Sequence, residues 1–208
     1  MMQKITTEKV KITNSGSGMS EALNITERAA GLLNLSTKDA LRARLLAEET
    51  LSMVRAVTGT FSADFWIEVE GRTFDIRLMA KSELDYPKRR ELLSVSTTGE
   101  NTAHLGIMEK IRGIIEAGMY GLEEGFKLQA EYGTGMFGYG TLGLPDDGIS
   151  DAMFMWSMQK YRADVEAKGD DEADSVDELE KSIIANIADD VKVGISKDSL
   201  ELSVVKKF

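Results

Sequence analysis

The glycine-rich stretch at 132–143, YGTGMFGYGTLG, has a spacing that could bind a phosphate. Gly133, Gly135 and Gly138 form the Gly-x-Gly-x-x-Gly pattern of a dinucleotide-binding loop. That chemistry requires a buried strand before the glycines and a helix directly after them, so that the pyrophosphate meets the helix N-terminus. The preceding EEGFKLQAEY is not a β-branched strand, and the following LGLPDDG consists of turn formers. The sequence therefore favours a mobile glycine-rich lid or linker.

A second stretch with chemical capacity is LLAEETLSMVRAV at 45–57, where Glu48 and Glu49 lie among apolar neighbours. A carboxylate that faces a pocket from a helix can act as a general base on water. Acidic pairs on helices are usually solvated, so the weight of this candidate depends on the fold around it.

The other residues capable of chemistry carry weaker signals. The chain has no cysteine and one histidine, His104, which excludes a disulfide scaffold, a cysteine nucleophile and a multi-histidine zinc site. The acidic run from Asp170 to Glu180 lacks the glycine and the spaced final glutamate of an EF-hand loop. The methionines and aromatic residues at 153–161 are typical of packing, and they also suit an adaptable binding surface.

Composition bounds the class of protein. The chain has 208 residues, of which 42% are hydrophobic and 29% charged, so it can bury a core as one domain. Its net charge of -10 argues against nucleic acid or anionic lipid as the main partner. The sequence has no apolar run long enough to span a membrane and no apolar signal region at its start. We therefore expect a soluble protein that, in a bacterium, is cytoplasmic.

Hydrophobic periodicity predicts the elements that must position these residues. Apolar side chains recur at helical spacing in some segments and alternate with polar ones in others. The expected elements are a strand at 9–13, helices at 19–34 and 37–57, a β-hairpin at 65–78, helices at about 100–117, 150–167 and 176–188, and a closing hairpin at 191–204.

This order predicts an α+β fold, a two-layer sandwich of one mainly antiparallel sheet with helices on one face. Residues 79–175 do not resemble core sheet, and a bare loop of that length is uncommon. We expect a single domain over 1–208, with 79–175 as a lid-like helical and glycine-rich insertion.

The element order, together with AEETLSMV on the long helix and IADDV before the closing hairpin, resembles a GHKL-type ATPase domain of the anti-sigma-factor serine kinase branch. The resemblance covers about 110 residues, 9–78 and 176–208. It implies that Glu49 matches the glutamate that positions or activates water. It also implies that Met53 stands where the family has an asparagine that binds magnesium.

The sequence departs from this family at its nucleotide-binding motifs. The family's Asp-x-Gly-x-Gly, whose aspartate contacts adenine, is absent from 79–83, where the chain reads MAKSE. The glycine box that should open the last helix is missing from SVDELEKS. Magnesium prefers oxygen ligands to the thioether of Met53, and phosphates would lose their backbone nest.

The resemblance with these losses favours a non-enzymatic regulatory module that binds a protein partner, sigma-factor-like or another regulator, with no cofactor. An ATP-binding protein or serine kinase stays open as the alternative, with Glu49 as base, Met53 beside the nucleotide, Mg²⁺ and ATP as cofactors, and Gly133, Gly135 and Gly138 in a rebuilt lid. A small-molecule binding module and a homodimer also stay open.

Overall fold

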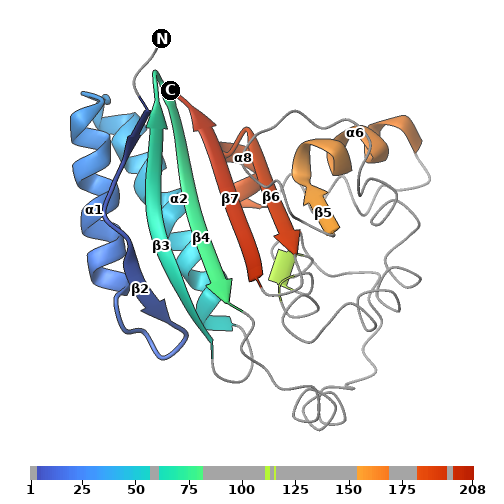
Figure 1. Ribbon diagram of the computed structural model, residues 1–208. Helices are drawn as coiled ribbons and strands as arrows, with labels where there is room; N and C mark the ends of the chain where they lie inside the picture. The colour runs from blue at the N-terminus through green and yellow to red at the C-terminus, as the bar shows by residue number, and fades with distance from the viewer. Residues whose placement is uncertain are drawn as a thin grey trace, which may run out of the picture.

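The computed structural model describes residues 4–56, 61–81, 111–112, 115, 154–168, 182–195 and 199–208. These residues form an α+β fold in which one open sheet carries helices on one face (Figure 1). The predicted fold class is confirmed. Within the expected insertion, Ile111 and Ile115 lie one helical turn apart and both are buried in the same core as the sheet.

The sheet has seven strands, and its strand order is β1-β3-β4-β7-β6-β5, with β2 also paired to β3. The first hairpin consists of β3 (Ser62–Glu70) and β4 (Thr73–Lys81), and the closing hairpin of β6 (Asp190–Ile195) and β7 (Ser199–Lys207). β4 pairs with β7 along its whole length, antiparallel like the other described pairings. The two expected hairpins therefore belong to one sheet.

One edge of the sheet is a bulged strand. β1 (Lys4–Thr6) pairs with residues 68–70 of β3, and β2 (Val10–Thr13) pairs with residues 62–65. The three residues 7–9 thus lie opposite the two residues 66–67 of β3. The extra residue makes this a β-bulge in the edge strand. The sequence predicted β2 but not β1, because three residues with exposed side chains carry little periodic signal.

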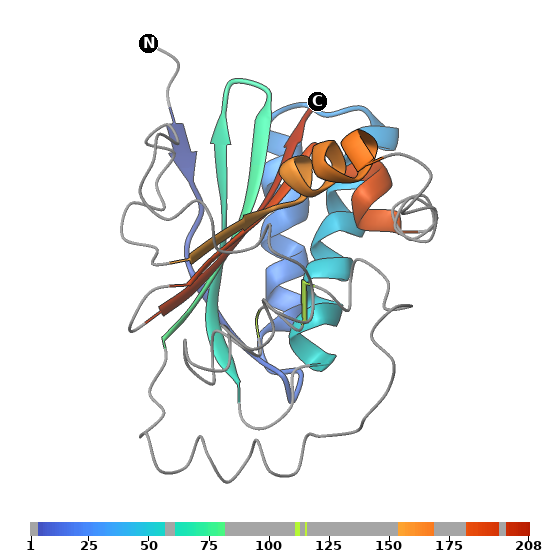
Figure 2. The same cartoon turned by 90° about the vertical axis from the view of Figure 1, so that its right-hand side faces the viewer.

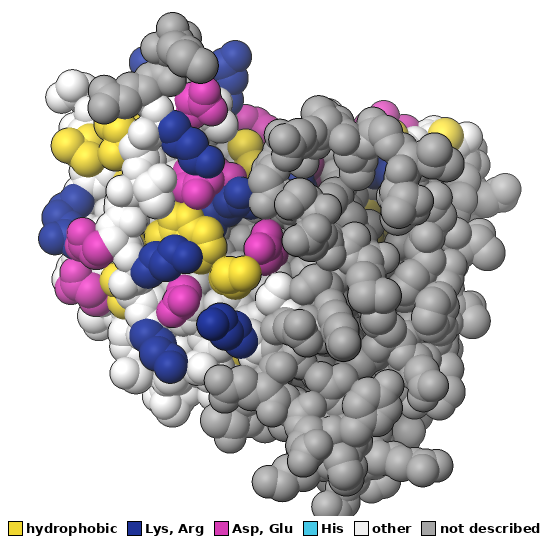
Figure 3. Space-filling model, in the orientation of Figure 1, with side chains coloured by type: hydrophobic (Ala, Val, Ile, Leu, Met, Phe, Trp, Pro, Cys, Tyr) yellow, Lys and Arg dark blue, Asp and Glu magenta, His cyan; other side chains and the backbone are white. Residues whose placement is uncertain are grey.

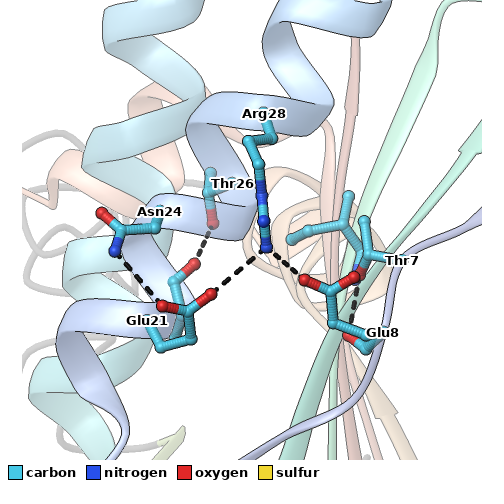
Figure 4. A network of polar contacts seen from close by, with 8 residues as sticks. Thr7, Glu8, Glu21, Asn24, Thr26 and Arg28 are labelled. Atoms are coloured by element: carbon cyan, nitrogen blue, oxygen red, sulfur yellow. Dashed lines mark hydrogen bonds and ion pairs between the residues drawn. The ribbon is translucent and has the colours of Figure 1, made fainter.

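Residues of the bulge make contacts on both faces of the sheet. Glu8 pairs with Arg28 of α1 (Met19–Leu32), and the same guanidinium lies 3.2 Å from Glu21 (Figure 4). On the sheet's other face, the Lys9 ammonium lies 4.3 Å from the centroid of the Trp66 ring. The edge is therefore held by exposed ion pairs on one side and a cation–π contact on the other.

The helical layer covers one face of the sheet, as Figure 2 shows for α1, α2 (Thr37–Ala56) and α8 (Ile183–Ile187). α2 contacts α1, α8 and β7. The alternating residues Phe65, Ile67 and Val69 of β3 point into this layer and are buried. Their neighbours along the strand face the opposite side, which carries no helix among the described residues and is called the helix-free face below.

Two expected helices differ from the structure. In the helix expected at 176–188, residues 176–181 lie outside the described residues, and α8 begins only at Ile183, after its N-cap Ser182, and ends at Ile187.

The helix expected at 150–167 begins only at Met158, as α6 (Met158–Lys168), because Phe154–Ser157 forms strand β5 on the edge next to β6. The expectation that 79–175 holds no sheet strand is thus wrong for β5, and also for residues 79–81, which continue β4 and pair with β7. The Ser157 hydroxyl accepts a hydrogen bond from the Lys160 N–H at 3.3 Å, so this serine caps the N-terminus of α6.

Candidate functional site

The two α2 residues of the predicted site occupy different environments. Met53 has a relative exposure of 3% and belongs to the core cluster with the sheet. Glu49, one helical turn earlier, is half-buried and makes no ion pair with any residue of the described part. The structure therefore places the carboxylate at the margin of the helix face and the thioether inside the core.

The helical repeat explains why Met53 is inside. Leu46, Thr50, Met53 and Val54 follow one another at intervals that bring them to the sheet side of α2, and all are buried. Thr50 is the one polar side chain on this buried face, and its hydroxyl donates to the Leu46 carbonyl at 2.8 Å. This face of α2 therefore offers no free side-chain oxygen to a metal ion.

The glycines of the predicted lid, Gly133, Gly135 and Gly138, lie outside the described residues. His104 and the acidic run from Asp170 to Glu180 do too. Their position relative to Glu49 and Met53 is therefore not tested, and the lid stays a prediction.

The described members of the methionine and aromatic cluster pack into the core. Trp156 of β5 is 9% exposed, and Met158 at the start of α6 is fully buried. The Tyr161 ring lies with its centroid 6.2 Å from that of Trp156. Their burial supports the packing interpretation of these side chains.

The IADDV segment, on which the resemblance partly rests, is a structural junction. Asp190 is buried, and its carboxylate accepts hydrogen bonds from the Ser157 hydroxyl at 3.0 Å and from the Gln159 N–H at 2.9 Å. The Gln159 N–H belongs to the first turn of α6, where a negative charge is favourable. Asp190 therefore ties β6 to the junction between β5 and α6.

Asp189 makes the complementary connection to the last strand. Its carboxylate accepts hydrogen bonds at 2.7 Å from the Lys206 ammonium and from the Lys207 N–H. Burial alone would raise the pKa of Asp189, but these two hydrogen bonds, together with the charges of Lys206 and Arg162, lower the pKa below its usual value. The two aspartates therefore anchor the start of β6 on both sides.

The structure also shows a polar cluster that the sequence did not indicate, on the helix-free face of the sheet. The Arg77 Nε lies 3.4 Å from Glu68 and 3.3 Å from Asp75. Asp75 accepts a hydrogen bond at 2.7 Å from the hydroxyl of Ser203, which is 1% exposed. Lys4 lies 3.0 Å from Glu68. Figure 3 shows that basic and acidic side chains surround hydrophobic ones on this face.

Burial and pairing perturb the two carboxylates of this cluster in opposite directions. Burial raises the pKa of Asp75 to about 6 against the opposing effects of Arg77 and Ser203. Burial would also raise the pKa of Glu68, but hydrogen bonds from the Trp66 indole and Lys4, together with Arg77, lower it. Because Arg77 is shared between carboxylates, the cluster does not present a free cation to an anionic ligand.

Over the ranges that the structure describes, no three histidine or acidic side chains come together as a metal site requires. None of the helices in those ranges is long and apolar enough to cross a membrane. Neither the family models nor the curated proteins nor the solved structures to which the chain was compared gave a match.

Proposed function

We propose that the chain is a regulatory protein-binding module with a degenerate GHKL ATPase-like fold, and that its ATP chemistry has been lost. The observation that carries the proposal is the burial of Met53, at 3% exposure, where the resemblance requires a magnesium ligand. A hard cation such as magnesium needs oxygen ligands at about 2.1 Å, and a buried thioether supplies none.

The neighbours of Met53 extend this argument to the whole helix face. Leu46, Leu51 and Val54 are buried with it, and they join α2 to the core. A magnesium-nucleotide bound against this face would require these side chains to leave the core. The missing adenine and glycine motifs support the same conclusion from the sequence. The protein-binding part of the proposal rests on analogy with anti-sigma factors.

One observation favours the alternative, an ATP-binding protein with unusual phosphate contacts. Glu49 is half-buried, and no described residue forms an ion pair with it. Its neighbour Glu48, in contrast, lies 2.9 Å from Arg44. A nucleotide held by other elements could therefore meet Glu49 without touching Met53.

Affinity capture with the full chain as bait tests the proposed function. We expect a protein partner to copurify from a lysate of the source cells, and the purified partner to rebind saturably with or without ATP and magnesium. Loss of rebinding without ATP would favour the alternative. A chain that stays monomeric and free of partners in every condition would contradict the proposal.

Two matched baits would show which layer the partner contacts. Leu32 and Leu41 are 64% and 57% exposed on the helical layer, and Ile5 is 41% exposed on the sheet edge. Serine replacements of the helical pair and of Ile5 remove apolar surface without opening the core. We expect one of these baits to rebind more weakly than the other.

A further inference from the structure

The geometry of the cluster on the helix-free face brings two carboxylates together. Glu68 of β3 and Asp75 of β4 are direct cross-strand partners, an arrangement in which like charges repel. Arg77 lies on the same face two residues after Asp75, and its Nε contacts both carboxylates. One guanidinium therefore lies between two carboxylates, and the Lys4 ammonium adds a second positive charge 3.0 Å from Glu68.

Asp75 has neighbours on both adjacent strands, because β4 lies between β3 and β7. On β7 its neighbours are the buried hydroxyl of Ser203, which donates to it, and Val205, which is its cross-strand partner. Charged groups act on it from the strands around it: Glu68 on β3, Arg77 on its own strand β4, and Lys192 on β6. Of these, Glu68 favours the protonated form of Asp75, while Arg77, Lys192 and the Ser203 hydroxyl favour the charged form.

We propose that Glu68, Arg77, Asp75 and Ser203 form a proton-responsive link between β3, β4 and β7, in which Asp75 binds a proton in mildly acidic solution and Arg77 then pairs with Glu68 alone. The proton converts the Asp75 carboxylate to a neutral carboxylic acid and removes the repulsion across the strands. The proposal concerns the helix-free face and does not depend on the proposed function.

The sign of the effect on stability follows from the direction of the shift. Burial raises the pKa of Asp75 from 3.8 to about 6, so the folded chain binds this proton more tightly than the unfolded chain does. The charged form of Asp75 therefore lowers the free energy of unfolding above about pH 6. This loss disappears as the pH falls toward about 4.

Denaturant unfolding of the wild type and of Asp75→Asn across this range tests the proposal. We expect the folding equilibrium constant of the variant, relative to wild type, to rise on the order of 100-fold between about pH 4 and pH 8. Asp64→Asn is the matched control, since Asp64 lies on the same face of β3 outside the cluster. Parallel pH profiles for wild type and Asp75→Asn would overturn the proposal.

A spectroscopic reading separates local protonation from changes in overall stability. The Trp66 indole donates to Glu68 at 3.1 Å, so its fluorescence in a Trp156→Phe background reports on the cluster. We expect a transition near pH 6 that is absent in Asp75→Asn. Ser203→Ala should move the midpoint to higher pH, because it removes a donor to the charged carboxylate. A transition with the same midpoint in wild type and all variants would show that it does not come from Asp75. The absence of any transition in the wild type would contradict protonation of the cluster.

Discussion

Replacing Met53 with asparagine, the residue that the resemblance calls for, should lower the free energy of unfolding by about 3–5 kcal/mol. Met53 is 3% exposed, so the shorter polar side chain leaves a cavity and buries an amide among apolar neighbours. Denaturant unfolding at neutral pH measures the loss. We expect no gain of magnesium-dependent ATP binding in the folded fraction of Met53→Asn.

Met53→Leu is the matched control, because it keeps the volume and apolar character of the side chain. Such a change should cost less than about 1.5 kcal/mol. If Met53→Asn instead folded as stably as Met53→Leu, the residue would have to face water in solution, contrary to its place in the core. Gain of nucleotide binding by Met53→Asn would likewise contradict the burial of Met53.

Replacing Gly18 with alanine should cost about 3 kcal/mol or more, because the residue combines left-handed backbone with a closed environment. Gly18 has φ +75°, and a Cβ on it would lie 2.1 Å from the Lys11 carbonyl oxygen. That oxygen belongs to the backbone of β2 and cannot move without disturbing the pairing of β2 with β3. Thermal and denaturant unfolding measure the effect.

Gly31→Ala provides the comparison within the same helix. Gly31 lies inside α1, and nothing lies within 4 Å of the position of an added Cβ. Alanine there should stabilise the protein by about 0.5–1 kcal/mol, since glycine is a poor helix former. Equal effects of the two substitutions on stability would show that the backbone at Gly18 lies farther from the Lys11 carbonyl oxygen than in the structure.

The sequence allowed the fold to be predicted where burial is one-sided. In the hairpins, apolar residues alternate at 65–69, 74–78 and 200–204, and these positions are buried as expected. Period-2 patterns of this kind report directly which face meets the helices. Because both hairpins have one apolar face, the sequence predicted that they pair in one sheet with that face against the helices.

Elements without a clear period could not be predicted in the same way. Phe154, Met155 and Trp156 are all apolar, so their pattern fits a buried helix as well as an edge strand. The segment forms a strand because it pairs with β6, and α6 begins only after Ser157, which caps it. The bulge at 7–9 depends on the register against β3, which no local pattern records.

The candidate site was predictable only in part. Apolar residues recur at helical spacing on the second helix and predict a buried stripe, which consists of Ala43, Leu46, Leu51, Val54 and Val57. The structure shows that Met53 is buried as well. The cluster around Arg77 requires the register of four strands, from Lys4 to Ser203, so it becomes visible only in the assembled sheet. The roles expected of Gly133, Gly135 and Gly138 lie outside the described residues and stay predictions.

Calorimetric titration of the wild-type chain with ATP and magnesium, paired with a thermal shift measurement, tests most directly whether the chain has lost nucleotide binding against α2. At nucleotide concentrations up to about 1 mM, where even a weak site would release or absorb measurable heat, we expect no saturable heat and no rise in melting temperature. Saturable, magnesium-dependent binding that is lost in Glu49→Gln would contradict the account, because a nucleotide would then lie against this helix.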